Sequence, residues 1–445
     1  MIELLAIAIF ILGLIFCLIL NINIIYALIF GFIIFVLYAL IKKYSYKQII
    51  EMSISGLKVI YKLLFTFILI GILTSAWRAS GTIQTIVTYS LNLIKPQFFI
   101  IITFFLCSLM SFLIGTSLGT GATMGVICAT MAESMGIPKY IVTGAIISGC
   151  FFGDRCSPVS TSAQLVATIT NTNQYDNIKL MFKSAFVPFI ITSIIYYILG
   201  YKYSSIESDL YIKKMFLENF NINIICLIPA IIIIILSICK MNVRVSITIS
   251  IIASIVIAIF VQGSSVNKLI NDLIFGYINP NKSISTLVDG GGAISMIRMI
   301  IVVGISSLYT GFFNKTNLIM GIKNKIKILA NRTTFFFAML VVTIISSIIS
   351  CNQTLTVMLT NEIMKDFEDI NKTKRAIMIE DSAILIPGLV PYSVAVSPII
   401  IATKANSFSI PFAFYLYIIP LYVLLKSFII KFIERNKNTL TKKIL

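Results

Sequence analysis

Four carboxylates of this chain lie in its apolar stretches, where a charged side chain needs a partner or a function. The chain has 17 acidic residues, and most of them lie at the ends of apolar segments or in polar loops. The four exceptions are Asp154, Glu362, Glu380 and Asp381. A carboxylate inside a membrane is costly unless it is paired, hydrated or protonated, so each is a candidate for binding cations or protons.

Asp154 is the strongest of these candidates. It follows Lys139, where an apolar helix is predicted to begin, by about 15 residues, or about 22 Å of helix. We expect the helix to break at Pro158, because proline lacks an amide donor and disfavours a helical residue before it. Burial would favour the protonated form of the Asp154 carboxyl group, whereas Arg155 or a bound cation would favour its ionised form. Asp154 could therefore exchange H⁺ for Na⁺, or form a structural ion pair with Arg155.

Glu380 and Asp381 lie near the end of the corresponding helix in the second half of the chain. Adjacent residues on a helix point about 100° apart, so at most one should face a site. The alternative is that both are structural, paired with Lys374 or Arg375. Glu362 is expected nearer to the membrane surface.

Neutral oxygen and amide groups surround these carboxylates in the sequence. Together with Asp154, Glu380 and Asp381, the predicted ion-binding residues are Thr116, Ser117, Thr120, Ser157, Ser160, Thr161, Asn352, Gln353 and Thr354. Hard oxygen ligands suit Na⁺, and we expect Asp154 and Asp381 to hold the transported ion. Small polar residues also serve as packing contacts between membrane helices, which is the alternative for any one of them.

One motif points to an enzyme. Residues 115–119 fit the G-x-S-x-G pattern around a nucleophilic serine, here Ser117. The chain contains no histidine to activate that serine, so an intramembrane serine hydrolase is an unfavoured alternative and no catalytic residue is predicted. No cofactor or resident metal is expected, because the eight cysteines show no paired spacing and read as small buried side chains.

The composition predicts an all-α, multi-pass membrane protein. Of its 445 residues 58% are hydrophobic and 12% charged, and the mean hydropathy is +1.00. We expect about 12–14 transmembrane segments, some of them broken helices or re-entrant hairpins. The clear apolar runs are 2–20, 22–41, 59–77, 98–114, 182–199, 222–239, 245–261, 293–313, 335–349 and 410–430.

The net charge of +18 fits a membrane topology better than nucleic-acid binding. Basic residues cluster after the second apolar run, between residues 315 and 332, and at the end of the chain, whereas residues 79–94 carry no charge. Because cytoplasmic loops are rich in Lys and Arg, both termini are predicted to be cytoplasmic and the two halves to have opposite orientations.

The two halves also resemble each other at an offset of 233 residues. Gly71, Ser117 and Pro158 fall on Gly304, Ser350 and Pro391. We predict one transport domain, 1–445, built of an N-terminal repeat (1–203) and an inverted C-terminal repeat (217–432), with a connecting loop (202–214) and a basic tail (433–445). Broken helices at Pro158 and Pro391 would place a binding site between the repeats, as in secondary transporters.

Four stretches carry a resemblance to a known family. SAWRASGTI (75–83), GTSLGTGATMG (115–125), GIPKYIVTGAIISGCFFGDRCSPVS (136–160) and KRAIMIEDSAILIPGLVPYS (374–393) resemble the NhaC-type Na⁺/H⁺ antiporter family. This resemblance implies an inverted-repeat fold and exchange of H⁺ for Na⁺, and relatives couple ions to malate, lactate or amino acids. It also implies that Asp154 and Ser157 form the polar site of the first half, and Glu380 and Asp381 the acidic pair of the second. Thr161 stands where the family has Asp, and Arg78 where an apolar residue is usual.

The sequence therefore predicts a secondary antiporter of a bacterial cytoplasmic membrane that exchanges Na⁺ and H⁺ by alternating access. The alternative is an ion-coupled exchanger or symporter of an organic acid or amino acid on the same scaffold. The expected partners are the two ions, the lipid bilayer, a small organic solute in the alternative case and a second copy of the chain as a candidate homodimer, but no nucleic acid.

Overall fold

The computed structural model describes most of the chain. The described residues are 2–20, 24–93, 95–158, 160–203, 209–239, 241–281, 285, 288–297, 300–302, 304–305, 307–308, 312, 323–365, 367 and 371–444. Within them the chain is helical, and the β-pairing is limited to an isolated antiparallel bridge between Tyr277 and Gly290. The predicted all-α class is confirmed.

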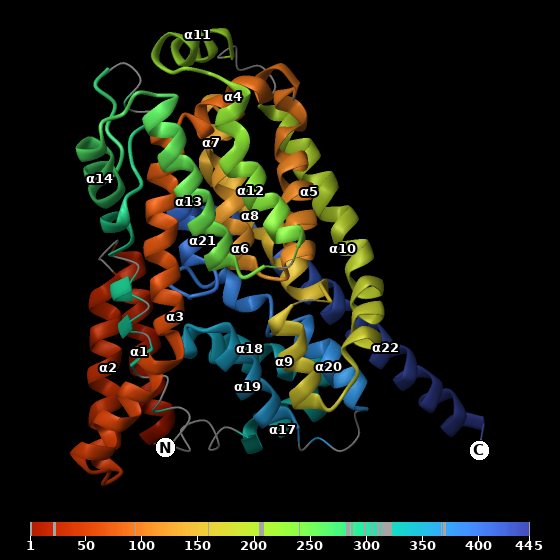
Figure 1. Ribbon diagram of the computed structural model, residues 1–445. Coiled ribbons are helices and arrows are strands. Elements are labelled where there is room, and N and C mark those ends of the chain that lie inside the picture. Colours follow the sequence, from red (N-terminus) through yellow and green to blue (C-terminus); the bar gives the residue numbers. More distant parts are fainter. Residues whose placement is uncertain are drawn as a thin grey trace.

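The first half of the chain begins with a hairpin of two apolar helices and a much longer third helix (Figure 1). Its helices are α1 (Ile2–Ile19), α2 (Ile24–Ile41), α3 (Tyr46–Ala79), α4 (Thr82–Leu93), α5 (Pro96–Ile114), α6 (Ser117–Thr120), the π-helix η1 (Gly121–Gly125), α7 (Val126–Ser134), α8 (Lys139–Cys156), α9 (Thr161–Thr170) and α10 (Gln174–Lys202).

The second half begins with α11 and η2, which are followed by a hairpin of two apolar helices, α12 and α13. Its helices are α11 (Asp209–Asn219), η2 (Ile224–Leu227), α12 (Ile228–Ile238), α13 (Val243–Phe260), α14 (Val266–Phe275), η3 (Ala293–Met296), α17 (Lys323–Arg332), α18 (Phe335–Ser350), α19 (Gln353–Met364), α20 (Lys372–Glu380), η5 (Ile386–Leu389), α21 (Ser397–Ala402), η6 (Ser407–Phe412) and α22 (Phe414–Ile444). Helix α11 begins inside the predicted connecting loop, and α22 continues through the predicted basic tail.

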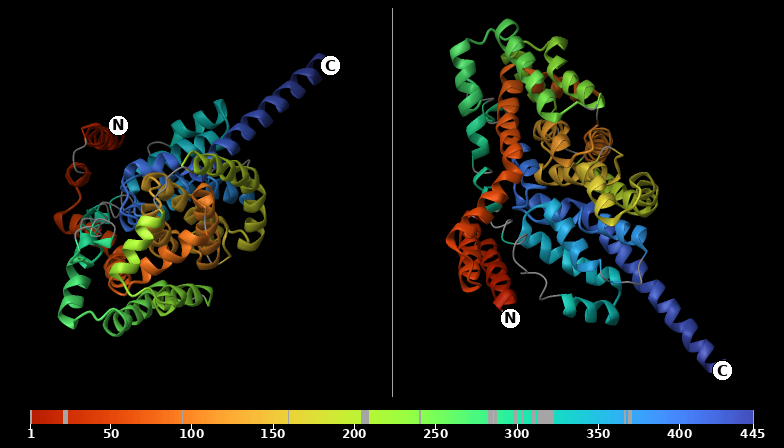
Figure 2. Two further views of the ribbon diagram at one scale, coloured as in Figure 1. Left: turned by 90° about the horizontal axis from the view of Figure 1, so that it is seen from above. Right: turned by 60° about the horizontal axis from the view of Figure 1, so that its bottom comes forward.

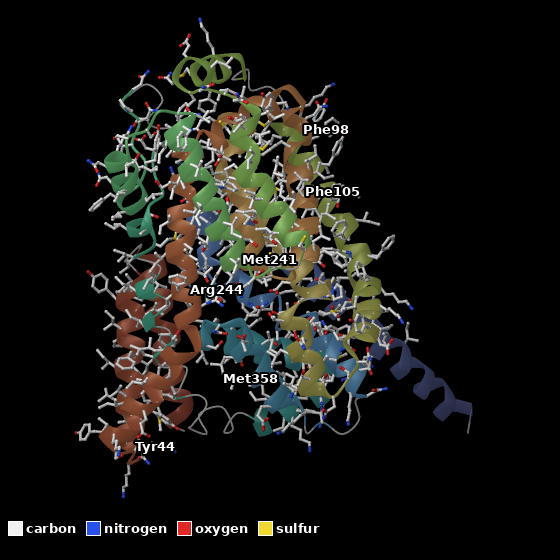
Figure 3. The ribbon with its side chains drawn as sticks, viewed as in Figure 1. Tyr44, Phe98, Phe105, Met241, Arg244 and Met358 are labelled. Carbon is white, nitrogen blue, oxygen red and sulfur yellow. The ribbon has the colours of Figure 1, made fainter. Side chains whose placement is uncertain are left out.

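Several of these helices suit a membrane. By length and composition, α5, α10 and Phe414–Ile433 of α22 could each cross one, and Leu64–Ala79 with Thr82–Tyr89, bent by 66°, could form a further span. Shorter apolar helices include those at 25–41, 244–260 and 335–350. Large apolar side chains face outward, among them Phe98 and Phe105 of α5 (Figure 3), as expected for a surface that contacts lipid. The chain is a multi-pass membrane protein.

Two helical hairpins reach the centre of the molecule from opposite sides. Helices α5 and α7 lie in the upper part of Figure 1 with α6 below them, whereas α18 and α19 lie in the lower part above α17. The chain reverses after α5 at Gly115 (φ 77°) and after α18 at Cys351 (φ 52°). Both are left-handed conformations, which end helices and favour glycine.

Glycines allow α8 to pack closely against α5. A Cβ atom on Gly149 would lie 2.7 Å from the carbonyl oxygen of Phe104, and one on Gly153 would lie 2.0 Å from the carbonyl carbon of Ser111. The spacing of four residues puts both glycines on one face of α8, the small-xxx-small pattern of membrane helix pairs. Ser111 completes the contact by donating to the carbonyl of Cys150.

The two predicted helix breaks differ. Helix α8 begins at Lys139, ends at Cys156 and is followed by α9 from Thr161, so the predicted break at Pro158 is confirmed. Helix α20 ends at Glu380 and the α-helix resumes as α21 at Ser397, so Pro391 lies within a longer break that begins earlier in the chain than predicted. Tertiary contacts maintain the earlier break: the Gln353 side chain donates to the carbonyl of Ile384 (2.9 Å), and the Val394 amide donates to the carbonyl of Cys351 (2.8 Å).

Candidate ion-binding site

Asp154 is buried at the centre of the two hairpins and accepts hydrogen bonds from both of them. It is 3% exposed. Its Oδ2 accepts from Ser117 Oγ (3.2 Å) and from Gln353 Nε2 (2.9 Å), and its Oδ1 accepts from Ser162 Oγ (3.1 Å). Each of these donors is neutral, so the carboxylate is solvated by the protein without being neutralised.

Three helix N-termini converge on this carboxylate. Ser117 is the first residue of α6, which continues through η1 into α7, Gln353 is the first residue of α19, and Ser162 is the second residue of α9. Helix N-termini carry a partial positive charge and amide donors that favour an anion nearby. The three N-termini therefore favour a negative charge on the Asp154 side chain.

The residues just before these N-termini are the caps that fix the turns. Thr116 caps α6 by accepting a hydrogen bond from the Gly119 amide (3.3 Å). Asn352 caps α19 in the same way, by accepting from the Leu355 amide (3.3 Å). Ser160 caps α9 by accepting from the amides of Ser162 and Ala163. Ser160 also donates to the main-chain carbonyl of Asp154. The polar caps therefore hold the donor side chains around the carboxylate.

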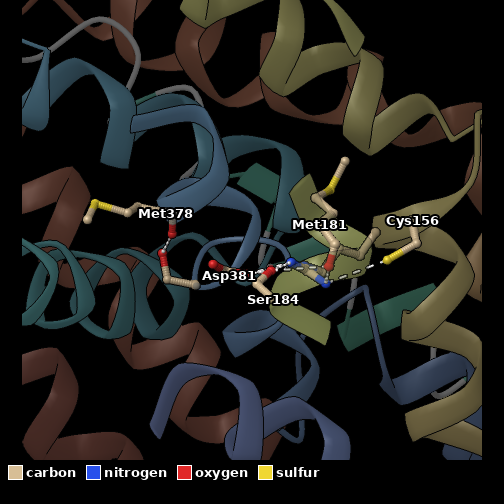
Figure 4. A network of polar contacts seen from close by, with 7 residues as sticks. Cys156, Met181, Ser184, Met378 and Asp381 are labelled. Carbon is tan, nitrogen blue, oxygen red and sulfur yellow. Dashed lines mark hydrogen bonds and ion pairs between the residues drawn. The ribbon is translucent and has the colours of Figure 1, made fainter. Parts of the chain in front are cut away.

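Arg155 does not neutralise Asp154; it pairs with Asp381. The guanidinium Nη2 forms an ion pair with Asp381 Oδ1, and both side chains are buried. Ser184 accepts from Nη2 at 2.7 Å and Nη1 donates to the carbonyl of Met181 at 3.3 Å (Figure 4). The alternative of an Asp154–Arg155 pair is therefore absent from the structure, and Asp381 contacts Arg155 rather than Asp154.

Glu380 lies beside this pair but has no partner of its own. It is 0% exposed, and neither Oε1 nor Oε2 meets a hydrogen-bond donor among the described residues. It interacts electrostatically with Arg155, Asp381 and Asp154. A buried carboxyl without a donor favours its protonated form. The adjacent acids thus have different environments: Asp381 is paired and Glu380 is unpaired.

A pocket of about 240 Å³ lies next to Asp154, between α9 and α19. Its polar lining is Thr161, Ser162, Gln353 and Thr354, and its apolar lining is Leu165, Val357 and Ile384. Ser162 and Gln353 line the pocket and also donate hydrogen bonds to Asp154, so their side chains lie between the carboxylate and the pocket. A hydrated ion in the pocket would be one layer of side chains away from Asp154.

The remaining predicted residues lie in less direct positions. Thr120 donates to the carbonyl of Thr116 (3.1 Å) and Ser157 donates to the carbonyl of Phe112 (2.5 Å), so both hydroxyls bond main-chain groups. Glu362 is exposed and pairs with Lys365 at 2.6 Å. Neither Lys374 nor Arg375 forms an ion pair with Glu380 or Asp381 within the described part of the chain.

Sequence reasoning missed Ser162 and Ser184. Ser162 follows Thr161, the residue in the expected acidic position, and donates to Asp154 from the first turn of α9. Ser184 lies on α10 and donates to Asp381 (3.2 Å). A serine in an apolar helix was the available signal for Ser184, but its partner on α20 is far away in the sequence.

Comparisons with known proteins agree with this architecture. A family model described as the Na⁺/H⁺ antiporter family matches residues 1–201 and 149–429. The chain is 27% identical to a malate-2H⁺/Na⁺-lactate antiporter of Bacillus subtilis over 79% of its own length and 77% of the relative's. It is 27% identical to the Na⁺/H⁺ antiporter NhaC of Bacillus subtilis (87% and 88% of the two chains) and 25% identical to NhaC of Alkalihalophilus pseudofirmus (84% and 83%). The chain belongs to the Na⁺/H⁺ antiporter family.

Proposed function

We propose that this protein exchanges Na⁺ for H⁺ and that Asp154 is the residue for which the two ions compete. The observation that carries the assignment is a buried carboxylate held by neutral donors, with no lysine or arginine in ion-pair contact among the described residues. Family membership and the NhaC relatives support the same pair of ions.

Competition at one carboxylate is sufficient to couple the two ions. Na⁺ requires an ionised carboxylate and additional oxygen ligands, which Ser117 Oγ, Ser162 Oγ and Gln353 Oε1 can supply around Asp154. Protonation removes the charge and releases the ion. Gln353 must rotate its amide for this, since it now presents Nε2 to Asp154 and Oε1 to Ser162.

Glu380 is proposed as a second proton carrier. It is buried without a donor and interacts electrostatically with Asp154, so a cation at Asp154 would favour ionisation of Glu380. Asp381 is proposed to fix Arg155 rather than to bind Na⁺, because its Oδ1 accepts from both Arg155 and Ser184.

The test is ion exchange in proteoliposomes with an imposed pH gradient and a fluorescent pH dye. Wild-type protein should dissipate the gradient when NaCl is added and leave it intact with choline chloride, whereas Asp154→Asn should respond to neither. Asp176→Asn is the matched control, because Asp176 is an exposed acid on α10 that pairs with the exposed Lys179. If folded Asp154→Asn still exchanges Na⁺, the site that both ions share would be Glu380 and not Asp154.

The second candidate function is ion-coupled exchange of a small organic acid. The relative that is named as a malate-2H⁺/Na⁺-lactate antiporter supports it, and so does a buried arginine, Arg78, that has no carboxylate partner within the described residues. A wild-type protein that releases radiolabelled lactate or malate only in exchange, and not in response to NaCl alone, would favour this function over simple antiport. The relatives are named as antiporters, which supports transport over hydrolysis at Ser117.

A further inference from the structure

Arg78 is a buried cation with an unused hydrogen-bonding edge. It lies one residue before the end of α3, at the 66° bend towards α4, and is 3% exposed. Its Nη1 donates to the carbonyl of Thr74 (2.8 Å), and no acceptor among the described residues meets Nε or Nη2. A buried guanidinium without a counter-ion costs stability, so its presence requires a reason.

The acids near Arg78 are engaged elsewhere. Glu133 pairs with Lys139 at 2.6 Å. Asp289 accepts from the Asn279 amide (2.8 Å) and from Ser285 Oγ (2.6 Å). Both interact with Arg78 only at longer range, through their charge. No carboxylate of the described residues therefore occupies the free edge of the guanidinium.

A second cation lies close to this region. Lys404, in the loop that follows α21, donates to the main-chain carbonyl of Asp289. The glycine loop that follows Asp289 rests on α3 one turn before Arg78, since a Cβ on Gly291 would lie 2.6 Å from the Ser75 amide nitrogen. Partial burial and the positive charge of Arg78 lower the pKa of Lys404 to about 8. The two cations therefore repel each other, and an anion between them would relieve the repulsion.

We propose that Arg78 binds a small carboxylate anion through Nε and Nη2, with Lys404 as the second positive charge of the site. Nε–H and Nη2–H lie side by side on the guanidinium and match the two oxygens of a carboxylate. Arg155 is less suited to this role, because Asp381 already neutralises its guanidinium and its Nη1 and Nη2 donate to Met181 and Ser184, which leaves only Nε without a partner among the described residues. The site is separate from Asp154 and deepens the second candidate function by assigning where its organic anion binds.

The experiment measures anion binding to the purified full-length protein at constant Na⁺. Sodium acetate is compared with sodium chloride at the same concentration, and methyl acetate serves as the uncharged analogue of the probe. Binding is followed by calorimetry and by the shift of the melting temperature. Acetate should bind and stabilise the protein, whereas chloride and methyl acetate should do so at least about tenfold less effectively, because neither offers two anionic oxygens.

The variants locate the site. Arg78→Met should raise the half-saturating acetate concentration at least about tenfold, and Arg78→Lys should also weaken binding because a lysine lacks the two-donor edge. Lys95→Met, which removes an exposed lysine at the start of α5, should leave it unchanged. Arg78→Met is expected to fold, since it removes an unpaired buried charge.

Acetate binding of equal strength in wild type and Arg78→Met, or equal stabilisation by chloride and acetate, would overturn the proposal. Asp154→Asn separates this result from the ion exchange: the variant should still bind acetate although it has lost the response to Na⁺. Loss of acetate binding in folded Asp154→Asn would show that the anion depends on the cation site and would also overturn a separate site at Arg78.

Discussion

At the scale of single residues, Arg155 divides the buried acids into two kinds. Asp381 is committed to the guanidinium, while Asp154 and Glu380 have no cationic partner among the described residues. Only a carboxylate without a permanent partner can exchange one cation for another. The ion pair therefore leaves Asp154 and Glu380 as the candidate groups for transport.

Breaking this pair should destabilise the protein without removing the ion site. Asp381→Asn leaves Arg155 buried with its charge uncompensated, so we expect a loss of about 3–5 kcal/mol of stability and a lower melting temperature. Asp176→Asn, which breaks the exposed pair with Lys179, should cost less than about 1 kcal/mol. Thermal unfolding in detergent measures both.

The double replacement Arg155→Met with Asp381→Leu provides the control for this prediction. It removes both charges together and should recover much of the stability that Asp381→Asn loses, because no buried charge remains unpaired. If Asp381→Asn melts with wild-type stability and loses only Na⁺ exchange, Asp381 is an ion ligand and the structural role is wrong.

The sequence identified the important acids but could not assign their partners. Asp154 and Glu380 were found because charges are rare in apolar runs, which needs no knowledge of the fold. The Arg155–Asp381 pair joins α8 to the end of α20, and the Gln353–Asp154 bond joins α19 to α8. Such contacts depend on how helices are arranged in space, and one sequence does not contain that information.

At the scale of helices, the contact between α5 and α8 fixes the depth of Asp154. Gly149 and Gly153 bring α8 against the backbone of α5, and Asp154 follows Gly153 directly. The carboxylate can reach Ser117 because α6 begins just beyond the end of α5. Close helix packing therefore positions the donor and the acceptor together.

Gly153→Ala should disrupt this packing and the site with it. Its Cβ would lie 2.0 Å from the backbone of Ser111, so the helices must separate, at a cost of about 1–3 kcal/mol. Exchange activity should fall because Asp154 moves away from Ser117. Gly304→Ala is the control, since a Cβ there meets no atom within 4 Å. Melting temperature and Na⁺-dependent exchange are measured on both variants, and wild-type values for Gly153→Ala would contradict this account.

The turns of the two hairpins have the same local structure, which supports the proposed repeat. Thr116 (φ −142°, ψ 133°) and Asn352 (φ −143°, ψ 128°) are extended caps that follow a left-handed residue and precede a short helix. These caps correspond at an offset of 236 residues, whereas α8 and α20 begin at an offset of 233, from Lys139 to Lys372. The sequence comparison matched Ser117 with Ser350, but the turn geometry matches it with Gln353. Hairpins of different length hide this correspondence in a sequence alignment.

At the scale of the whole molecule, the helix directions suit two halves of opposite orientation. Helix α1 begins and α22 ends on the same side, and the hairpins α1–α2 and α12–α13 lie towards opposite ends of the molecule (Figures 1 and 2). The positive-inside rule predicts that the side of the termini is cytoplasmic, because the basic tail of α22 lies there. The opposite side, where α11 lies (Figure 1), is then predicted to be external.

The pocket beside Asp154 lies in the half of the molecule that also holds the termini (Figure 1). It lies between α9 and α19, which Figure 1 places in the lower part of the molecule. Thr161 and Thr354 of its lining are exposed, whereas Ser117, on the hairpin from the other side, is buried. With the termini in the cytoplasm, we predict an inward-facing state, in which Na⁺ would enter from the cytoplasm and reach Asp154 past Ser162 and Gln353.

Thiol labelling from the two sides of the membrane tests this assignment. The background variant is Cys239→Ser, which removes the cysteine that is exposed among the described residues. In this background, Thr354→Cys should react with an impermeant maleimide in inside-out vesicles and not in right-side-out vesicles. Glu218→Cys, on the exposed face of α11, should show the opposite pattern. Na⁺ should slow labelling at position 354, because an ion between Asp154 and Gln353 restricts the pocket, and should leave labelling at 218 unchanged. Equal labelling of both positions from one side would refute the opposite placement of α11 and the pocket, and with it the inward-facing state.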